Sequence, residues 1–405
     1  MLHWLELLRR HWNYALGQRL DWLNRTRCQI DRCSIKSEPI GGIPERPNYN
    51  FQSAQLKQTK ELFPEYKGIY HDAQQQNLMR LDKAWQCWLV PDAKGKRAGR
   101  PRFKKSGELR SFTFPRINSE KAGAHLIGDI LRLSKIGEIP VIVHRPIPDG
   151  FKPKTCSLVK KADGCYVSIV IEDASVPSPM PIDTVKTAVG IDVGLKEFLV
   201  DSEGEAVPIQ QHYRKAQAKL ALAQRRLAHK IKGSANYQKL ANHIACLHQH
   251  VARVGKDFHY QIAYKLCKTY DLIGLEDLNI KGLAKTRLAK SILDAAWGSF
   301  AQILEAVAVK CGNWIVKVNP YGTSQRCSGC DKNVPKALSV RTHECPHCGT
   351  LLDRDHNAAI NIKNLALNTV GLTVSACGDF EVTRSVNQEL STAKKRSSRY
   401  TARLA

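Results

Sequence analysis

Four of the chain's 13 cysteines fall into two Cys-x-x-Cys pairs, and this spacing constrains local folding more than any other feature. Two intervening residues let one turn present both sulfurs to a single ion, and two such turns complete a tetrahedron of thiolates. The pattern predicts one structural zinc ion, with an iron site or thiol redox chemistry as alternatives. His343 and His347 lie nearby but are not needed as ligands, and Asp331 stands where a Gly often follows the second sulfur. The predicted zinc ligands are Cys327, Cys330, Cys345 and Cys348.

The chain is strongly basic, with 62 Lys and Arg against 37 Asp and Glu and a formal charge of +25 over 405 residues. Self-repulsion of this size favours a polyanionic partner, so nucleic acid is the expected ligand. An apolar fraction of 43% supplies a globular core and excludes a disordered or collagen-like chain. No stretch reaches the ~18–20 consecutive apolar residues of a membrane span, so we expect no membrane partner and a cytoplasmic, nucleoid-associated location. The odd cysteine count argues against a disulfide framework.

Residues 1–110 have the pattern of helices followed by a basic loop. Apolar side chains recur every four residues from Trp4 to Leu20. Residues 94–110 carry eight basic residues and one acid, and Gly and Pro there prevent regular structure. Phe103 among these cations favours a nucleic-acid contact over a merely solvated loop. The cations of this loop expected to bind nucleic acid are Arg97, Arg100, Arg102, Lys104 and Lys105.

Short alternating strands are expected over residues 111–182, where they fit a small β-barrel or sandwich.

Residues 206–256 contain ten Lys or Arg and no acid. Their apolar residues recur at spacings of three and four, which predicts an antiparallel helical hairpin over residues 206–270. Without acids to form i,i+4 pairs, phosphate binding is favoured over a solvated helix pair. Residues 377–405 lack periodicity and are expected to form a flexible basic tail. The hairpin cations expected to bind nucleic acid are Arg214, Lys215, Lys219, Arg225, Arg226, Lys230 and Lys232.

Three carboxylates occupy suggestive positions. Asp192 lies in an apolar strand, Glu276 ends a second one, and Asp355 opens a helix. A charged carboxylate in an apolar strand is costly unless it binds a metal or a partner, and three at one sheet edge would hold two Mg²⁺ ions about 3.5–4 Å apart for phosphodiester hydrolysis. Asp-Val-Gly after a strand is also found in the phosphate loop of actin-like ATPases, although Leu195 replaces the small hydroxyl residue of that loop. Asp353 has a second interpretation as a helix N-cap.

The order of these features resembles the TnpB (OrfB) family of transposon-encoded, RNA-guided DNA nucleases, which are related to the type V CRISPR effectors. The resemblance covers roughly residues 5–370 and rests on the stretches GRPRFKK, GIDVGLKEF, IGLEDLNIKGL, LAKSILDAAWGSF, NPYGTSQRCSGC and CPHCGTLLDRDHNAAINI. It implies a multi-domain α/β protein with a RuvC-type, ribonuclease-H-like nuclease domain over residues 183–376. It further implies a zinc ribbon inserted at residues 321–352, a wedge-like β-barrel at 111–182 and a helical recognition lobe at 1–110.

The resemblance also assigns roles to single residues. Asp192, Glu276 and Asp355 match the acids that bind the catalytic Mg²⁺ ions, and Asp355 is preferred to Asp353 because the family's acid stands two residues before the Asn. The four clustered cysteines match the zinc ligands. The wedge and the hairpin would grip a guide RNA, whose base pairing reads the target DNA while the protein reads a short flanking motif. The chain departs from the family in starting directly in helical sequence at Met1, where relatives begin with a strand that would contribute to RNA affinity and motif reading.

The expected function is therefore an RNA-guided, Mg²⁺-dependent DNA endonuclease encoded by a transposable element, acting as a monomer with its RNA. The alternative is a guided DNA-binding protein that regulates or blocks DNA without cutting it. A transposase that joins DNA ends itself is disfavoured, because the sequence has no His-hydrophobe-His pair with a partner Tyr.

Overall fold

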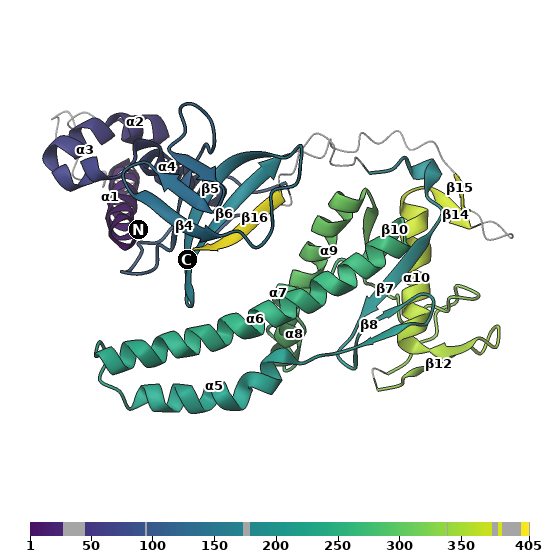
Figure 1. The fold of residues 1–405 in the computed structure, drawn as a ribbon. Helices are drawn as coiled ribbons and strands as arrows, with labels where there is room; N and C mark the ends of the chain where they lie inside the picture. The colour runs from purple at the N-terminus through teal and green to yellow at the C-terminus, as the bar shows by residue number, and fades with distance from the viewer. Residues whose placement is uncertain are drawn as a thin grey trace, which may run out of the picture. The chain divides into compact units, whose positions relative to one another are not determined.

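The computed structural model describes residues 1–26, 45–93, 95–172, 179–337, 339–374, 380–382 and 398–404. The chain divides into two compact units, Met1–Ala174 with Ala393–Ala405 and Ser175–Thr392 (Figure 1). Both units combine helices with a β-sheet. The chain therefore has the multi-domain α/β organisation that the sequence predicts.

The first unit begins with helices that pair through an apolar seam. They are α1 (Leu2–Thr26), α2 (Tyr49–Ala54), α3 (Leu56–Leu62), the 3-10 helix η2 (Pro64–Gly68) and α4 (His71–Leu89). Trp12 and Leu16 of α1 share a buried cluster with Leu78 of α4. Arg19 is also buried in this layer and pairs with Asp82 at 2.9 Å. Because an unpaired buried charge is costly, this ion pair helps to fix how α1 meets α4.

A seven-stranded antiparallel sheet follows, in the order β1-β5-β6-β16-β4-β3-β2. Its strands are β1 (Ser111–Phe114), β2 (Ala124–Ile127), β3 (Ile130–Leu133), β4 (Gly137–Ile142), β5 (Lys152–Lys161), β6 (Gly164–Glu172) and β16 (Ser398–Leu404). Trp4 of α1 packs against Phe112 of β1, with ring centroids 5.3 Å apart, so α1 joins the sheet to the helical layer. Within the described residues no pairing between β1 and β2 closes the sheet into the barrel expected for residues 111–182.

The C-terminal tail differs from the prediction. The sequence predicts a flexible basic tail over residues 377–405, yet Ser398–Leu404 forms β16 and pairs with both β6 and β4. The open edges of β6 and β4 offer backbone donors and acceptors that a further strand can satisfy whatever its side chains, which explains why composition did not reveal it. The prediction is therefore wrong for these residues. Apart from Phe380–Val382, which forms a short strand, the rest of that range lies outside the described residues.

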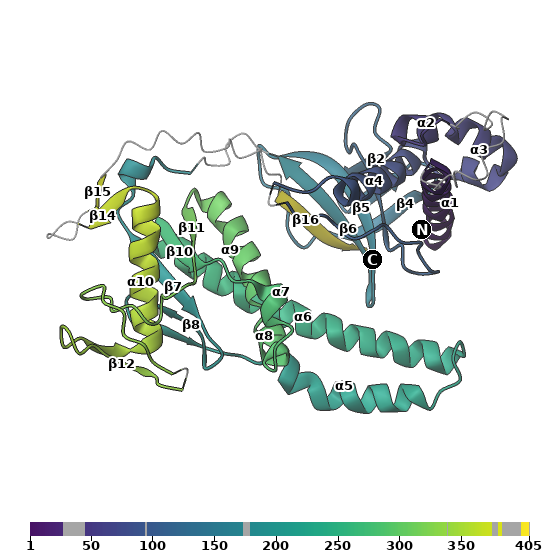
Figure 2. The same cartoon turned by 180° about the vertical axis from the view of Figure 1, so that it is seen from behind.

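The second unit is built on a five-stranded mixed sheet in the order β11-β10-β7-β8-β9. Its strands are β7 (Ala188–Val193), β8 (Glu197–Asp201), β9 (Ala206–Pro208), β10 (Leu272–Glu276) and β11 (Trp314–Val318). Strand β10 runs parallel to both of its neighbours, β7 and β11. Val189 and Ile191 of β7 belong to a core with α6 and α9, whereas Ala188 belongs to a core with Ile362 of α10. The two faces of the sheet are thus covered by different helices, and Figure 2 shows α10 running beside β7 and β10.

The helices of this unit include the predicted basic hairpin. They are η3 (Ile182–Thr184), a 3-10 turn, and α5 (His212–Ala228), α6 (Ala235–Thr269), α7 (Ile280–Leu283), α8 (Ala289–Ala295), α9 (Trp297–Cys311) and α10 (Arg354–Thr369). Helices α5 and α6 form the hairpin, and Leu220, Ala223 and Ile244 bury its seam. The predicted range of 206–270 begins too early, because Ala206–Pro208 pairs with β8 as strand β9.

Two small hairpins complete the second unit. Strand β12 (Thr342–Glu344) pairs with β13 (Leu351–Asp353), and β14 (Leu372–Val374) pairs with β15 (Phe380–Val382). Strand β13 leads directly into α10. The cysteine-rich segment is therefore continuous with the helix that covers the sheet.

The stretch Ala289–Cys311 is long and apolar enough, by length and composition, to cross a membrane. It consists of two helices, α8 and α9, which meet at Ala296 in the left-handed conformation with φ of 53°. Phe300 and Leu304 of α9 are buried in the core that this helix shares with β7 and β10. These apolar residues are thus accounted for by the core of the second unit.

Candidate functional site

Two of the predicted carboxylates stand where neighbouring parallel strands end. Asp192 lies near the end of β7, and Glu276 is the last residue of β10. Side chains alternate between the faces of a strand, and the preceding residues Ile191 and Leu275 both belong to the core with α6 and α9. Asp192 and Glu276 therefore lie on the opposite face, which α10 covers.

Glycines on both strands allow α10 to approach this face closely. A Cβ atom on Gly190 would lie 2.1 Å from the carbonyl oxygen of Ala359, and one on Gly274 would lie 2.8 Å from the Cβ of Ala366. Since only glycine leaves this space, the contact fixes where α10 crosses the sheet. The first turn of α10 then brings the charge of Asp355 to the strand ends, where it acts on Asp192.

The two acids at the start of α10 have different partners. Oδ1 of Asp353 accepts the N–H of Asp355 at 2.8 Å and caps the helix. The carboxylate of Asp355 instead forms ion pairs with Arg341 and Arg354, each at 3.2 Å. Asp353 therefore serves the helix terminus, whereas Asp355 contributes charge to the site.

The electrostatics of the site favour a bound cation. Burial raises the pKa of Asp192 well above its usual range, the charges of Glu276 and Asp355 raise it further, and Arg354 opposes them. Burial also raises the pKa of Glu276, against a hydrogen bond of 2.6 Å donated by the Thr323 hydroxyl. Crowded carboxylates of this kind either take up protons or bind a cation. Their hard oxygen donors suit Mg²⁺.

The carboxylates and the cysteines differ in how closely they are gathered. Within the described ranges, one set of potential ligands has all its atoms within 4.8 Å of one another, and it consists of Cys327, Cys330, Cys345 and Cys348. His343 is buried and His347 is exposed, and neither belongs to this set. The three carboxylates interact electrostatically but do not reach this spacing, and Asp355 is held by its two arginines.

The sulfur geometry suits a tetrahedral metal. The Sγ atoms of Cys327 and Cys348 lie 3.6 Å apart, and those of Cys330 and Cys345 lie 3.5 Å apart. A tetrahedron with Zn–S bonds of about 2.3 Å has edges of about 3.8 Å, whereas a disulfide would need about 2.05 Å. Hydrogen bonds from the hydroxyl and N–H of Thr350 lower the pKa of Cys348 to about 6, which favours the thiolate form that binds metal.

The two cysteine turns have the same backbone construction. Asp331 and Gly349 each follow the second sulfur of a pair, with φ of 61° and 72°. Their N–H groups donate to the carbonyls of Cys327 and Cys345 at 2.9 Å and 3.0 Å. Asp331 thus adopts the left-handed conformation for which Gly is the usual choice.

Sequence analysis missed two asparagines that join the cysteine segment to α10. Asn357 accepts the N–H of Ser328 at 2.9 Å and donates to the carbonyl of Arg326 at 2.8 Å. The buried amide of Asn361 donates to the carbonyls of Thr323 and Arg326 at 2.8 Å and 2.7 Å. Polar residues at i and i+4 on the otherwise apolar face of α10 were the available signal. Through Thr323 these bonds connect the cysteine segment to the hydroxyl that holds Glu276.

The cations predicted to bind nucleic acid are distributed over both units. In the basic loop, Lys104 is half-buried with its ammonium 4.6 Å from the Trp12 ring centroid. The other predicted cations of that loop, all exposed, are Arg97, Arg100, Arg102 and Lys105. The predicted cations of the hairpin, also exposed, are Arg214, Lys215, Lys219, Arg225, Arg226, Lys230 and Lys232. Their contact with nucleic acid stays a prediction.

Two family models match separate parts of the chain. Residues 169–287 match the OrfB_IS605 family, described as "Probable transposase". Residues 297–362, which include all four clustered cysteines, match the Cas12f1-like TNB domain. The first match contains Asp192 and Glu276, and the second contains Asp355.

Curated relatives share a substantial part of the sequence. A Streptomyces pristinaespiralis protein named as a candidate RNA-guided DNA endonuclease is 34% identical over 254 residues, which cover 62% of this chain and 61% of that protein. The chain thus matches less than two thirds of that relative's length. InsQ of Escherichia coli K12, named in the same way, is 28% identical over 323 residues, or 75% of each chain. The TnpB-like protein L79 of Acanthamoeba polyphaga mimivirus is 31% identical over 206 residues, covering 46% of this chain and 38% of its own.

A solved structure has a similar fold. A chain in the cryo-EM structure of a Cas12f1–sgRNA–target DNA complex superimposes with a TM-score of 0.55 at 13% identity. The superposition covers 90% of this chain and 82% of that one. At this identity the similarity is one of fold.

Proposed function

Because this chain belongs to the TnpB (OrfB) family, we propose that it is a transposon-encoded, RNA-guided DNA endonuclease that depends on Mg²⁺. Its partners would be a guide RNA and a target DNA, bound by a monomer located in the cytoplasm with the nucleoid. The observation that carries the proposal is the placement of Asp192 and Glu276 at the ends of two neighbouring parallel strands, with Asp355 in the first turn of the helix that covers them. The charges of Glu276 and Asp355 accordingly raise the pKa of Asp192. Such a group of acids serves metal-dependent phosphodiester hydrolysis.

The proposal assigns a role to each part of the chain. Residues 183–376 would form a RuvC-type, ribonuclease-H-like domain with a zinc ribbon at 321–352 inserted before its last acid. Residues 111–182 would serve as the wedge and residues 1–110 as the recognition lobe. The mixed sheet covered by α10 supports the assignment of the nuclease domain, and the spacing of the four sulfurs supports that of the zinc ribbon.

Asp192, Glu276 and Asp355 would hold the two Mg²⁺ ions, which when bound supply an activated water and stabilise the leaving oxygen. The hydroxyl of Thr323 fixes the orientation of Glu276 through its 2.6 Å hydrogen bond. Arg354 offsets part of the negative charge on Asp192 and Asp355. The four clustered cysteines would hold a structural zinc ion that keeps the segment before α10 folded.

The test compares the wild type with Asp192→Asn as complexes purified with the RNA expressed from the native flanking DNA. Cleavage of a plasmid that matches the guide is measured with and without Mg²⁺. We expect Asp192→Asn to lose cleavage while it retains RNA, since the substitution preserves shape and removes one ligand charge. Asp257→Asn is the matched control, because Asp257 is exposed on α6 and accepts a hydrogen bond from Gln261 at 2.9 Å, away from the predicted carboxylates. Equal cleavage by wild type and Asp192→Asn would overturn the assignment.

The alternative function is guided DNA binding without cleavage. The two arginine ion pairs that already occupy the Asp355 carboxylate favour it. A wild-type complex that binds its matched target with Mg²⁺ present and leaves it intact would establish this alternative. Target binding is therefore measured alongside cleavage in the same samples.

A further inference from the structure

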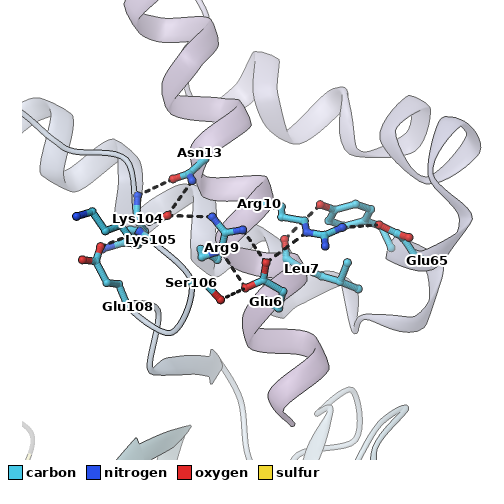
Figure 3. A network of polar contacts seen from close by, with 11 residues as sticks. Glu6, Leu7, Arg9, Arg10, Asn13, Glu65, Lys104, Lys105, Ser106 and Glu108 are labelled. Carbon is cyan, nitrogen blue, oxygen red and sulfur yellow. Dashed lines mark hydrogen bonds and ion pairs between the residues drawn. The ribbon is translucent and has the colours of Figure 1, made fainter. Parts of the chain in front are cut away.

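The basic loop of the first unit is not a free loop where it meets α1. Residues 100–106, here called the basic strap, lie along α1 and are held by their backbone (Figure 3). The side-chain amide of Asn13 donates to the carbonyl of Lys104 at 2.9 Å and accepts the N–H of the same residue at 2.8 Å. Arg9 donates to that carbonyl at 2.9 Å, and the Trp12 indole donates to the carbonyl of Arg102 at 3.3 Å. Side chains of α1 thus bind the backbone of the strap through hydrogen bonds.

The acids near the strap are occupied in holding it. Glu6 pairs with Arg9 at 2.6 Å and accepts the Ser106 hydroxyl at 3.4 Å, as Figure 3 shows. The hydrogen bond from Arg9 lowers the pKa of Glu6 to about 2, so Glu6 stays charged and keeps Arg9 in place. Glu108 accepts the backbone N–H of Lys105 at 2.8 Å and closes the turn after the strap. The partners of the Glu6 and Glu108 carboxylates are thus groups other than the side chains of Arg102 and Lys105.

The strap presents three cations and one aromatic ring to solvent. The guanidinium of Arg100 lies 5.9 Å from the Trp88 ring centroid, which leaves the two cations nearest Phe103 in the sequence. Phe103 is 55% exposed, and Arg102 and Lys105 are exposed near it. In the part of the chain that the structure describes, no hydrogen bond or ion pair engages the guanidinium of Arg102 or the ammonium of Lys105. Lys104 alone turns toward α1, above Trp12. A single exposed apolar side chain is common on protein surfaces. Phe103 differs because four hydrogen bonds fix the backbone of its neighbours Arg102 and Lys104.

We propose that the basic strap binds an unpaired nucleotide, with the base stacked on Phe103 and the adjoining phosphates contacted by Arg102 and Lys105. A duplex hides the faces of its bases, so an exposed ring between free cations matches a single strand. The fixed backbone reduces the conformational entropy lost on binding. The proposal rests on the proposed function only in taking nucleic acid as the partner. RNA and DNA offer the same stacking chemistry, and the test includes both.

The test uses the full chain with zinc bound and without Mg²⁺, so that cleavage plays no part. Affinity is measured by fluorescence anisotropy for single-stranded RNA, single-stranded DNA and the duplexes of the same sequence. Phe103→Ala should weaken single-strand binding about tenfold and duplex binding less than twofold, because stacking is lost while charge is kept. Phe103→Trp should restore single-strand binding. Phe63→Ala is the matched control, since Phe63 is 53% exposed in the same unit but lies outside the strap.

Other surfaces of this basic chain also bind nucleic acid under the proposed function, so a local measurement is needed. Ultraviolet crosslinking of the bound single strand should attach to a peptide containing Phe103, and Phe103→Ala should remove that crosslink. Lys105→Gln should lower the slope of log affinity against log salt by about 1, whereas Phe103→Ala leaves the slope unchanged. Equal losses for single strands and duplexes, or wild-type affinity with no crosslink in residues 100–106, would overturn the proposal. Neither result depends on cleavage, so failure here is distinct from failure of the nuclease assignment.

Discussion

The two metal sites proposed for the second unit are assembled in opposite ways. The four cysteines lie in two turns with matching backbone geometry, and their sulfurs are already gathered within 4.8 Å. The carboxylates come from β7, β10 and α10, and they meet only because the helix packs closely onto the sheet. The first site depends on local sequence, whereas the second depends on tertiary packing and on arginines that offset only part of its negative charge.

The difference shows where each site is vulnerable. Removing a ligand from the cysteine site should unfold a short segment and leave the sheet intact. Disturbing the contact between α10 and the sheet should affect the carboxylate site without touching any of its ligands. The two sites are not fully independent, because Asn357 and Asn361 of α10 bind the cysteine segment through hydrogen bonds.

The largest expected effect follows from Cys345→Ser. A structural zinc site contributes roughly 10–16 kcal/mol of binding free energy in isolated peptides, so loss of one thiolate should release the ion and unfold the segment before α10. Zinc content, measured by mass spectrometry of the native protein, should fall from one ion per chain to none. Cys311→Ser is the control, because Cys311 is exposed in the same unit and lies outside the cluster. Retention of zinc by Cys345→Ser would contradict the assignment of the ligands.

Gly190→Ala should have the next largest effect, and it acts on the other site. The added Cβ would lie 2.1 Å from the carbonyl oxygen of Ala359, so α10 must move away from β7. We expect a loss of about 3 kcal/mol or more in the free energy of unfolding, together with weaker Mg²⁺ binding and unchanged zinc content. Denaturant unfolding and metal titration measure these quantities.

Gly255→Ala is the matched glycine control. It lies in α6, where the new Cβ meets only the Cδ2 of His212 at an ordinary 3.7 Å. Its expected effect is a gain of up to about 1 kcal/mol from helix propensity. Equal stability of Gly190→Ala and wild type would show that α10 does not depend on the close contact.

Asn361→Ala tests the connection between the sites and should have a smaller effect. It removes two hydrogen bonds to backbone carbonyls and should cost about 1–3 kcal/mol. Zinc should then dissociate faster and Mg²⁺ bind more weakly, because Thr323 loses its support beside Glu276. Asn364→Ala, exposed on the same helix, should stay within about 0.5 kcal/mol of wild type. An effect on only one metal would show that the two sites are independent.

The same contrast explains what the sequence revealed. The Cys-x-x-Cys spacing and the ends of apolar strands are local patterns, so the cysteine cluster and the positions of Asp192 and Glu276 on their strands could be predicted. The two ion pairs of Asp355 and the insertion of β16 depend on contacts between distant segments, which no local pattern records. The basic strap lies between these cases: its charge was evident, whereas its attachment to α1 through Asn13 was not.

The smallest expected effect, measured per pH unit, is the change in the stability that each site contributes as pH changes. Burial and neighbouring charge raise the pKa of Asp192, and burial raises that of Glu276, above the values of the unfolded chain. Without Mg²⁺, the protonated forms of these two carboxyls contribute to the free energy of unfolding fully below about pH 4, the ordinary pKa of the unfolded chain. This contribution is lost as pH rises through their raised pKa values, by at most about 1.4 kcal/mol per pH unit for each group. Asp192→Asn has no carboxyl at this position and so loses no stability there as pH rises. It should therefore become more stable than the wild type at higher pH. Mg²⁺ should reduce this difference in the free energy of unfolding, because it binds and stabilises the wild type.

The cysteine site should respond in the opposite direction, because zinc binding releases protons from thiols and strengthens as pH rises. Unfolding of the zinc-bound wild type and Asp192→Asn is therefore compared between pH 5 and 8, with and without Mg²⁺. A difference between the two proteins that grows with pH and shrinks with Mg²⁺ locates the repulsion at Asp192. A constant difference would mean that the Asp192 carboxyl does not change protonation in this range, and that the carboxylate site is less crowded than its neighbouring charges indicate.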